Sequence, residues 1–412
     1  MASRKDRGGR LLRKGESYRE SDGMYIFTYT DSSGKRRYTY SKSLLALRDK
    51  ERAILQDKLD GIDTGAGQFV NLNKMFDIYM STKIDLRETT RQGYLDTYRR
   101  YVRKDFGKNK IVTIKYTDVL KFYSDLLVEK KLHISTIKRI QRLIRPTLEL
   151  AVRDNIIRTN PADGVIKMLS KKNMKESVVR HALTMEQQRA FLNYIDVNPL
   201  YDRWYPLLVF MFGTGCRVGE VIGLRWDDID FEKRQISINH SITYMANRQN
   251  GIPTGWVLND PKTESGTRII PMVEAVYQAL QREKTKQDII GERCVTEVEG
   301  MKNFIFFNKN HEIYIPEGIN KLLHRAVTKY NEAETIRALE ENREPDLLPQ
   351  FSCHYIRHTF CARLCEADMN IKAIQSVMGH RDIQTTLDIY AEVSEHKKKE
   401  ALNKVFENMD LF

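Results

Sequence analysis

MGHRDIQTTLDIY, at residues 378–390, is the most informative stretch of this chain, because it places a tyrosine ten residues after a histidine. Three basic strings precede it: TGCRVGE at 214–220, PKT at 261–263 and HYIR at 354–357. A phenol that attacks a phosphodiester needs cations on the non-bridging oxygens and groups that move protons. One tyrosine with two arginines, a lysine and two histidines therefore predicts chemistry on a phosphodiester without a metal.

Two of these strings have a local structural interpretation. Arg217 follows a Gly-x-Cys break and precedes apolar residues at helical spacing, so it stands at a helix start, where its charge opposes the helix dipole. We expect an anionic partner there, either Glu220 in an ordinary salt bridge or a bound phosphate. His354 and Arg357 lie one helical turn apart and emerge on one face of a helix. Alone, such pairs are common on ordinary helices.

The four strings, in this order, resemble the tyrosine recombinases, also called phage-type integrases. HYIRHTF, at residues 354–360, matches the His-x-x-Arg-His-x-Phe pattern of that family, with Ile356 in place of the more usual leucine. The resemblance reaches from about residue 70 to the C-terminus. The joint occurrence of all the landmarks in family order argues against coincidence.

The resemblance implies a catalytic role for six residues, which are Arg217, Lys262, His354, Arg357, His380 and Tyr390. The two arginines hold the scissile phosphate, with Glu220 in support, and the lysine protonates the departing 5′ oxygen from a turn between two strands. The first histidine moves a proton and donates a hydrogen bond, and the second donates to a non-bridging oxygen. The tyrosine attacks phosphorus. Because the reference pKa of a phenol is about 10, the cations and a general base must stabilise the phenolate. His358 is expected to be structural.

Composition agrees with a multidomain, DNA-binding protein. A chain of 412 residues is too long for one ordinary domain, and its 41% hydrophobic and 30% charged residues allow a sizeable core. The net charge of +13 favours a polyanionic partner, although charge alone does not separate DNA from RNA or an anionic membrane surface. No apolar run approaches the roughly 18–20 residues that span a bilayer, and the longest, at 204–212, predicts a buried helix.

The termini and cysteines bear on the compartment. The basic N-terminus lacks an apolar segment, which disfavours a secretory signal. Five scattered cysteines without a Cys-x-x-Cys pair predict neither a zinc site nor a disulfide framework, and Cys353 is expected to be a buried thiol. A reducing bacterial cytoplasm is the expected location, with the protein on the nucleoid when it binds DNA.

Residues 1–65 predict a small α+β module. Apolar and polar residues alternate over 24–29, turn residues follow, and 36–40 returns as a second strand before a helix that begins after Ser43. One face of the sheet serves the helix through Tyr25, Phe27 and Tyr29. The other face is left for solvent or a partner, and it carries Arg19, Thr28, Tyr38 and Tyr40. The segment resembles the arm-binding domain of conjugative-transposon and phage integrases, which implies a three-stranded sheet laid into a DNA groove.

Residues 66–165 read as helical throughout, with apolar stripes at helical spacing and a last helix capped by Ser135. Basic residues cluster on the opposite faces, among them Arg139 and Arg142; solvated cations are the ordinary interpretation, and phosphate contact is the alternative favoured by the net charge. The position matches the core-binding, SAM-like domain of the family. The Lys-rich stretch 166–180 predicts an exposed linker.

Residues 181–412 form the predicted catalytic domain. A helix capped by Thr184 opens it, and Gly215 ends a second helix before the first catalytic arginine. Strands are expected at 236–238, 256–258 and 268–271, with helices thereafter. An apolar stripe within 394–412 predicts a C-terminal helix that packs in its own subunit or, as the family implies, docks onto a neighbouring protomer.

The sequence as a whole indicates a multidomain fold: a small α+β module with a three-stranded sheet, an all-α core-binding domain, and a mainly α catalytic domain with a small antiparallel sheet. The implied function is site-specific recombination through a 3′-phosphotyrosine and a Holliday junction, which integrates and excises a mobile element without metal, ATP or other cofactor. The implied partners are double-stranded DNA with core and arm sites, three further protomers in a tetramer, an excisionase and a DNA-bending host protein. A type IB topoisomerase and a DNA-binding regulator on an inactive scaffold are the alternatives; a metal-dependent nuclease is disfavoured because the carboxylates lack ligand spacing.

Overall fold

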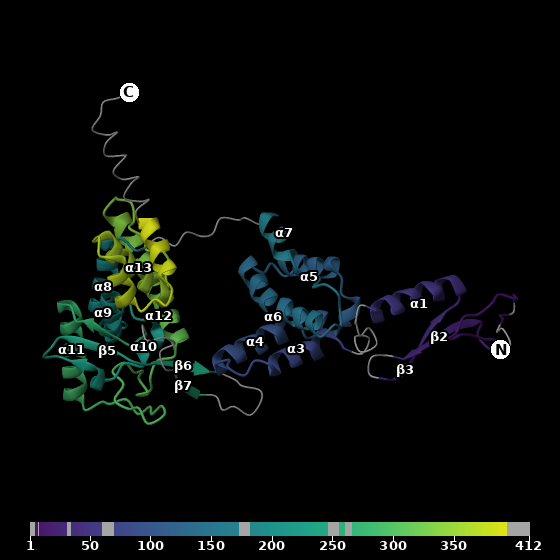
Figure 1. Ribbon diagram of the computed structural model, residues 1–412. Coiled ribbons are helices and arrows are strands. Elements are labelled where there is room, and N and C mark those ends of the chain that lie inside the picture. Colours follow the sequence, from purple (N-terminus) through teal and green to yellow (C-terminus); the bar gives the residue numbers. More distant parts are fainter. Residues whose placement is uncertain are drawn as a thin grey trace. The chain divides into compact units, whose positions relative to one another are not determined.

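The computed structural model describes residues 5–6, 8–30, 34–59, 70–172, 182–245, 255–259 and 266–393 (Figure 1). The chain divides into two compact units, Met1–Ser177 and Val178–Phe412, and each is described by itself. In the described part, no helix is both long and apolar enough to cross a membrane.

The first unit begins with an antiparallel three-stranded sheet in the order β1-β2-β3, followed by one helix (Figure 1). Alternation places Tyr25 and Phe27 on one face, where they are buried against Leu44 and Leu47 of the helix, with Tyr29 packed at the edge. The predicted division of the sheet into a core face and an outer face is therefore confirmed. The elements are β1 (Glu16–Arg19), β2 (Met24–Thr30), β3 (Arg36–Ser41) and α1 (Leu44–Leu59).

The rest of the first unit is helical, as predicted, around a core in which Phe76 and Tyr98 stack with ring centroids 3.6 Å apart. Its helices are α3 (Leu72–Ser81), α4 (Glu88–Tyr101), α5 (Tyr116–Val128), α6 (Ile134–Arg153) and α7 (Val165–Lys172), with short 3-10 turns η1 (Phe106–Lys108) and η2 (Ile111–Thr113).

Two expectations for this region are wrong. His133, not Ser135, caps α6: its ring nitrogen accepts from the backbone N–H of Ser135 at 3.2 Å. The stretch taken as the start of a linker is helical: α7 continues through residues 166–172, and its Leu169 is buried in the core. The predicted linker residues 173–180 lie outside the described residues.

The second unit is mainly helical with two small sheets. Three strands form one antiparallel sheet in the order β4-β5-β8, and β6 pairs with β7 in another. Its strands are β4 (Ile229–Asp230), β5 (Gln235–Ile238), β6 (Ser241–Met245), β7 (Gly255–Asn259) and β8 (Arg268–Pro271). Its helices are α8 (Met185–Val197), η3 (Asp202–Trp204), α9 (Tyr205–Thr214), α10 (Val218–Ile222), η4 (Trp226–Asp228), α11 (Glu274–Ile290), α12 (Pro316–Glu340), α13 (Cys353–Glu366) and α14 (Ile371–Met378), followed by a helical stretch at 383–393.

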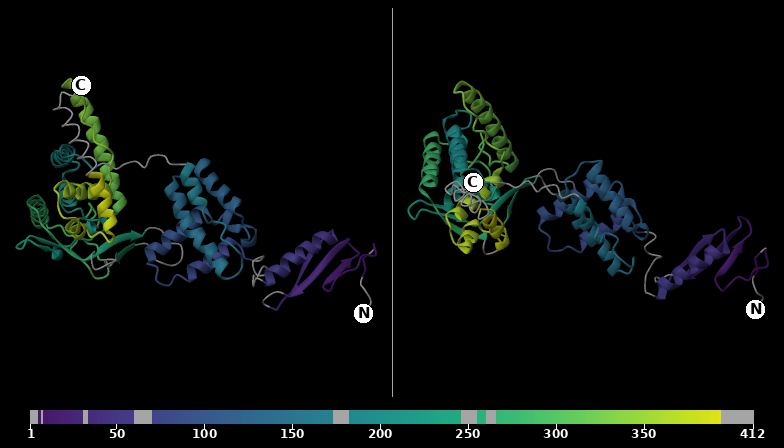
Figure 2. Two further views of the ribbon diagram at one scale, coloured as in Figure 1. Left: turned by 45° about the horizontal axis from the view of Figure 1, so that its top comes forward. Right: turned by 90° about the horizontal axis from the view of Figure 1, so that it is seen from above.

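Helix α9 is the centre of this unit. All its residues from Pro206 to Phe212 are buried, since α8, α11 and α13 pack around it, and the buried helix predicted from its apolar sequence is confirmed. Thr184 caps α8 together with Gln187, as predicted. The long green helix in Figure 2 is α12, which contributes Ile319, Leu323 and Val327 to the same core.

Candidate active site

The site begins where α9 ends at Gly215. This residue has a φ of 60°, in the left-handed region that favours glycine, and a Cβ atom there would lie only 2.4 Å from Cδ1 of Phe360. The turn allows the chain to leave α9 and to place Arg217 at the N-cap of α10. The predicted break before this arginine is therefore confirmed, and close packing against α13 gives it a second physical reason.

Glu220 supplies the anionic partner expected for Arg217. Its carboxylate accepts the backbone N–H of Arg217 at 2.8 Å and the Nη1 donor of the same residue at 2.9 Å. The arginine side chain keeps 45% of its surface exposed, whereas that of Glu220 keeps 7%. The carboxylate thus anchors Nη1, while nearly half of the arginine side-chain surface stays accessible to a ligand.

Arg268, at the start of β8, is the second partner of Glu220 and was not predicted to belong to the site. Its Nη2 and Nη1 donate to the two carboxylate oxygens at 2.8 and 3.2 Å. Burial alone would raise the pKa of Glu220, but the hydrogen bonds and charge of Arg268, with the charge of Arg217, hold that pKa below its ordinary value. The carboxylate therefore remains ionised between two arginines.

Three arginines converge on the C-terminal end of α14. The backbone oxygens of Val377, Met378 and Gly379 accept in turn from Arg268 Nε at 2.8 Å, Arg357 Nη2 at 2.5 Å and Arg217 Nη2 at 2.7 Å. The last carbonyls of a helix carry partial negative charge and lack partners within the helix, so cations are stabilised there. Gly379 closes the helix with a φ of 62°.

Arg357 is the most deeply placed cation that was predicted. It is 4% exposed, and its Nη1 donates to the backbone oxygen of Gly215 at 2.8 Å. Burial and then the charge of Arg217 lower the pKa of Arg357 to about 10, so it remains charged at neutral pH. It ties the end of α9 to the end of α14, which are far apart in sequence.

His380 follows the same helix end and is 7% exposed. Burial, followed by the charges of Arg357 and Arg217, lowers the pKa of this imidazole to about 4. The ring is therefore neutral at pH 7, and its Nδ1 lies 2.9 Å from Oγ1 of the buried Thr386. When the hydroxyl donates to Nδ1, the ring proton resides on Nε2, which leaves His380 one further donor.

His354 and Tyr390 lie at the margins of this cluster. His354, one helical turn before Arg357 on α13, is exposed, and its charge is among those that lower the pKa of His380. Tyr390 is half-buried, packs on a small core formed by α13 and α14, and lines a surface hollow with Ile371, Lys372 and Leu387 among others. The structure thus brings together Arg217, Arg357 and His380, and joins Tyr390 to a neighbouring set of side chains.

Lys262 lies outside the described residues. Its segment was expected to be a turn between two strands, and the described residues on either side of it do form two strands, β7 and β8. Strand β7 pairs with β6, whereas β8 pairs with β5 in the other sheet, so the segment connects two sheets.

Cys353, which was predicted to be a buried thiol, is buried, and the structural role predicted for His358 stays a prediction. All five cysteines are free thiols, and Cys353 is 4% exposed, with burial raising its pKa to about 12. Nε2 of His358 lies 3.6 Å from a carboxylate oxygen of Glu392, in the helical stretch that carries the tyrosine.

The predicted outer face of the N-terminal sheet has the expected composition. Thr28 is paired with Tyr38 across β2 and β3, and Ile26 with Tyr40. These four paired residues therefore share one face of the sheet. Tyr38 is 53% exposed and Tyr40 40%, and the guanidinium of Arg19 lies 5.5 Å from the centroid of the Tyr40 ring. An aromatic and basic sheet face open to solvent is suited to contact with nucleic acid.

The cations of the helical region divide into two groups. Several are bound within the protein, for example Arg145 to Asp163 and Arg99 to Asp96, both at 2.7 Å. Arg139 and Arg142 are exposed on α6, although Arg139 also donates to Thr97 at 3.0 Å. The two residues singled out from the sequence are therefore accessible to a phosphate backbone, and Arg145 and Arg99, which are exposed as well, each already pair with a carboxylate.

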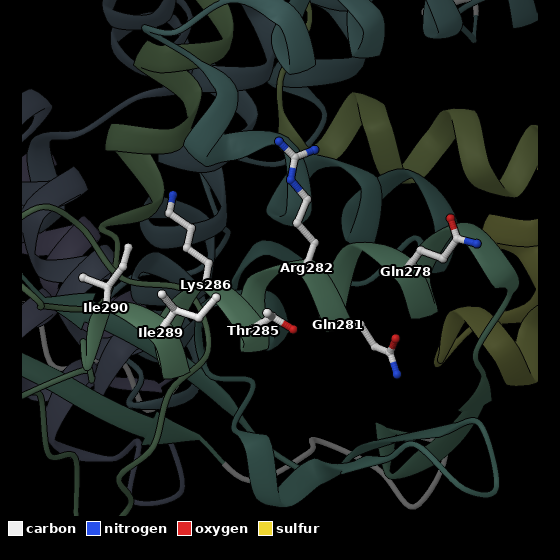
Figure 3. Close-up of a pocket in the computed structure, with 7 residues that line it drawn as sticks. All are labelled: Gln278, Gln281, Arg282, Thr285, Lys286, Ile289 and Ile290. Atoms are coloured by element: carbon white, nitrogen blue, oxygen red, sulfur yellow. The ribbon is translucent and has the colours of Figure 1, made fainter.

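Other hollows do not coincide with this chemistry. One lies along a single face of α11, lined by Gln278, Arg282, Lys286 and Ile290 among others, and holds none of the predicted catalytic residues (Figure 3). Within the described ranges, no group of three His, Cys, Asp or Glu side chains is placed to hold a metal ion. The arginine cluster, with one neutral histidine, is arranged to bind an anion with several negative oxygens, such as a phosphodiester.

Comparisons with known proteins agree with this chemistry. The family described as "Phage integrase family" matches residues 181–397, "DNA binding domain of tn916 integrase" matches 1–58, and "Phage integrase, N-terminal SAM-like domain" matches 71–127. The transposase from transposon Tn916 of Enterococcus faecalis is 31% identical, over 94% of this chain and 93% of that protein. The ICEBs1 integrase of Bacillus subtilis is 23% identical, over 82% and 83%.

A solved structure is similar as well. The Tn1549 transposon integrase in complex with transposon right end DNA is 29% identical, with a TM-score of 0.68, over 80% of this chain and 99% of that one. A second structure holds that integrase with a circular intermediate DNA, at 28% identity and a TM-score of 0.67.

Proposed function

Because this chain belongs to the phage integrase family of tyrosine recombinases, we propose that it cuts and rejoins double-stranded DNA at specific sites, and so integrates and excises a mobile genetic element. The observation that carries the proposal is the convergence of Arg217, Arg357 and His380 at the end of α14. Integrases of conjugative transposons are similar over nearly the whole length of the chain, which supports an element of that class.

The proposed reaction is a transesterification at phosphorus. The Tyr390 hydroxyl oxygen forms a bond to phosphorus and loses its proton, while the bond from phosphorus to the 5′ oxygen breaks and that oxygen gains a proton. The product is a 3′-phosphotyrosine and a free 5′ hydroxyl. Because the covalent link keeps the energy of the phosphodiester, a 5′ hydroxyl of a second duplex can reverse the step on a new partner without ATP. Two such exchanges form and resolve a Holliday junction.

Each predicted residue takes a role that fits its environment. Arg217 and Arg357 bind the non-bridging oxygens, and Arg357 remains charged at neutral pH although it is buried. His380, neutral and bonded at Nδ1, donates from Nε2 to the same oxygens. His354, exposed at the margin, moves a proton, and Lys262 protonates the leaving 5′ oxygen. The helical stretch that carries Tyr390 begins three residues after His380, which couples the nucleophile to the phosphate site.

The domains divide the DNA between them in this proposal. Residues 1–65 bind arm sites through Arg19, Thr28, Tyr38 and Tyr40, the helical region from residue 66 to the end of α7 binds core sites through Arg139 and Arg142, and the segment after α7 links them to the catalytic domain at 181–412. A homotetramer assembles on two core sites in the bacterial cytoplasm. The C-terminal helix at 394–412, outside the described residues, docks onto a neighbouring protomer. An excisionase and a DNA-bending host protein are the further partners proposed.

The proposal is tested with a suicide substrate, a core-site duplex nicked beside the crossover, taken from the junctions that flank the element. Wild-type protein should form an SDS-resistant protein–DNA adduct in EDTA, and Tyr390→Phe should form none while still binding the duplex. Tyr277→Phe is the matched control, since that hydroxyl only accepts a bond from Gln281 on α11, and its adduct should equal that of the wild type.

Three results would contradict parts of this function. An adduct with Tyr390→Phe shows that another residue attacks. Binding without an adduct in any variant favours a regulator on an inactive scaffold. Adduct formation followed by relaxation of supercoils, with no joining between two duplexes, favours a topoisomerase of type IB.

A further inference from the structure

Arg268 is the arginine at the end of α14 that has no role in the mechanism above. We propose that Arg268 is a positioning residue of the cleavage reaction: by neutralising Glu220 and fixing the end of α14, it keeps the charge of Arg217 available to the scissile phosphate. This inference rests on the proposed function.

The contacts of Arg268 separate it from a residue that touches DNA. Its side chain is 4% exposed, and all three of its guanidinium nitrogens donate within the protein, whereas the contacts found for Arg357, which is also 4% exposed, involve only Nη1 and Nη2. The Arg268 guanidinium donates to both oxygens of Glu220, to the backbone oxygens of Val377 and Gly266, and weakly to the sulfur of Cys216 at 3.8 Å. With these donors engaged inside the protein, Arg268 acts only through the groups that it holds.

The charges explain what it does to Arg217. Glu220 lies between two arginines, and its one negative charge is shared by two positive ones. Without Arg268, the same carboxylate, 7% exposed, has Arg217 as its remaining bonded cation. A buried carboxylate interacts strongly with its one remaining cationic partner, because an unpaired charge in the interior is costly. Arg217 would then be neutralised by Glu220 instead of facing a phosphate.

The contact of Arg268 with the end of α14 affects the other end of the Arg217 guanidinium. Arg268 Nε holds the Val377 oxygen, and the next two backbone oxygens along the chain accept from Arg357 and Arg217. A shift of the helix end would therefore move the acceptors of both phosphate-binding arginines together with His380. The two effects of Arg268, on charge and on geometry, meet in Arg217.

The test measures single-turnover adduct formation by full-length protein on the nicked core duplex, with wild type establishing the basal reaction. Arg268→Met should lower the rate about 10- to 100-fold, the effect expected when a hydrogen-bonded charge is lost. The double variant Arg268→Met/Glu220→Gln should be faster than Arg268→Met, because it removes the carboxylate that captures Arg217. A role limited to folding predicts that the second substitution brings no recovery.

A second readout uses a duplex with an uncharged methylphosphonate at the scissile position. If Arg268 acts through the charge that Arg217 offers to a non-bridging oxygen, the deficit of Arg268→Met should shrink on this substrate. Arg343→Met is the matched control, since Arg343 likewise neutralises a glutamate, Glu334, that is 4% exposed. Arg343→Met should lower the stability of the protein and leave the cleavage rate on both substrates the same as that of the wild type.

The outcomes are separable. The inference is overturned if Arg268→Met slows cleavage equally on both substrates and the double variant is no faster than Arg268→Met. In that case, an adduct formed by the wild type still supports the proposed function. If Arg268→Met shows no cooperative unfolding transition, Arg268→Lys takes its place in both comparisons. The lysine keeps the charge, but its single ammonium cannot reach Glu220 and the Val377 oxygen with the geometry of a guanidinium.

Discussion

Substitution of Gly215 by alanine should destabilise the catalytic unit more than the same substitution at Gly291. Both glycines end a helix in the left-handed region, with φ values of 60° after α9 and 76° after α11. They differ in their surroundings. A Cβ at Gly291 meets no heavy atom within 4 Å, whereas at Gly215 it meets Cδ1 of Phe360 at 2.4 Å and Sδ of Met378 at 3.2 Å. The pair thus separates backbone strain from crowding.

The expected magnitudes follow from these distances. Left-handed backbone costs an alanine about 1–2 kcal/mol, which is the whole expected effect at Gly291. At Gly215 the ring atoms nearest the backbone of Phe360 are the ones approached, so the side chain cannot simply rotate away, and crowding adds about 1–3 kcal/mol. The total there is about 2–5 kcal/mol. The same crowding disturbs the Gly215 oxygen that accepts from Arg357, so adduct formation should fall as well.

Urea unfolding followed by tryptophan fluorescence measures the difference. All three tryptophans, at 204, 226 and 256, lie in the catalytic unit, so the signal reports that unit alone. With a denaturant slope of about 2.5 kcal/mol per molar, the midpoint of Gly215→Ala should lie about 0.4–1.2 M below that of Gly291→Ala. Equal midpoints for the two variants would refute the reasoning that packing against α13 requires glycine at this turn.

Three further predictions concern single side chains. Thr386→Val removes the hydroxyl next to His380 Nδ1 and should slow adduct formation about 10-fold, as expected for one lost hydrogen bond, whereas Thr335→Val, at an exposed position of α12, should not. Arg19→Gln should weaken binding to duplexes from the ends of the element and reduce the salt dependence by about one phosphate contact, with Arg52→Gln on α1 as an unaffected control; an unchanged slope argues against that face. Burial and the charges of Arg357 and Arg217 lower the pKa of His380 from 6.5 to about 4, so the unfolded chain binds a proton in this window that the folded chain does not. Stability should therefore fall as pH drops from 6.5 to 4, and His380→Gln should lose less over the same window in urea midpoints.

Local patterns made much of the fold predictable. The alternation over residues 24–29 identified the two faces of the N-terminal sheet, and Gly215 and Thr184 marked helix ends correctly, because each feature is governed by neighbours within a few residues. The family resemblance, carried by the strings around Arg217, Arg357 and Tyr390, is confirmed by the match to residues 181–397. The roles of the individual catalytic residues and the domain boundaries stay predictions.

What the sequence did not reveal depends on distant partners. Arg268 was recognised only as the first residue of a strand, and its partners Glu220 and Val377 lie 48 and 109 positions away. One signal was present: strand alternation puts Arg268 on the same inward side as Ile270, and a buried cation requires an anion. The helical start of the predicted linker was missed because the stretch is rich in lysine, which obscured the signal of Leu169, a residue buried in the core.

The arginine cluster also has a consequence for the order in which the protein is made. Arg217, Arg268 and Arg357 are synthesised before the helix end that arranges them, and the acceptors at Val377, Met378 and Gly379 emerge from the ribosome later. A nascent chain stopped before residue 377 contains all three cations but not the backbone oxygens that set their directions. A competent phosphate site therefore forms only when translation has nearly reached Tyr390.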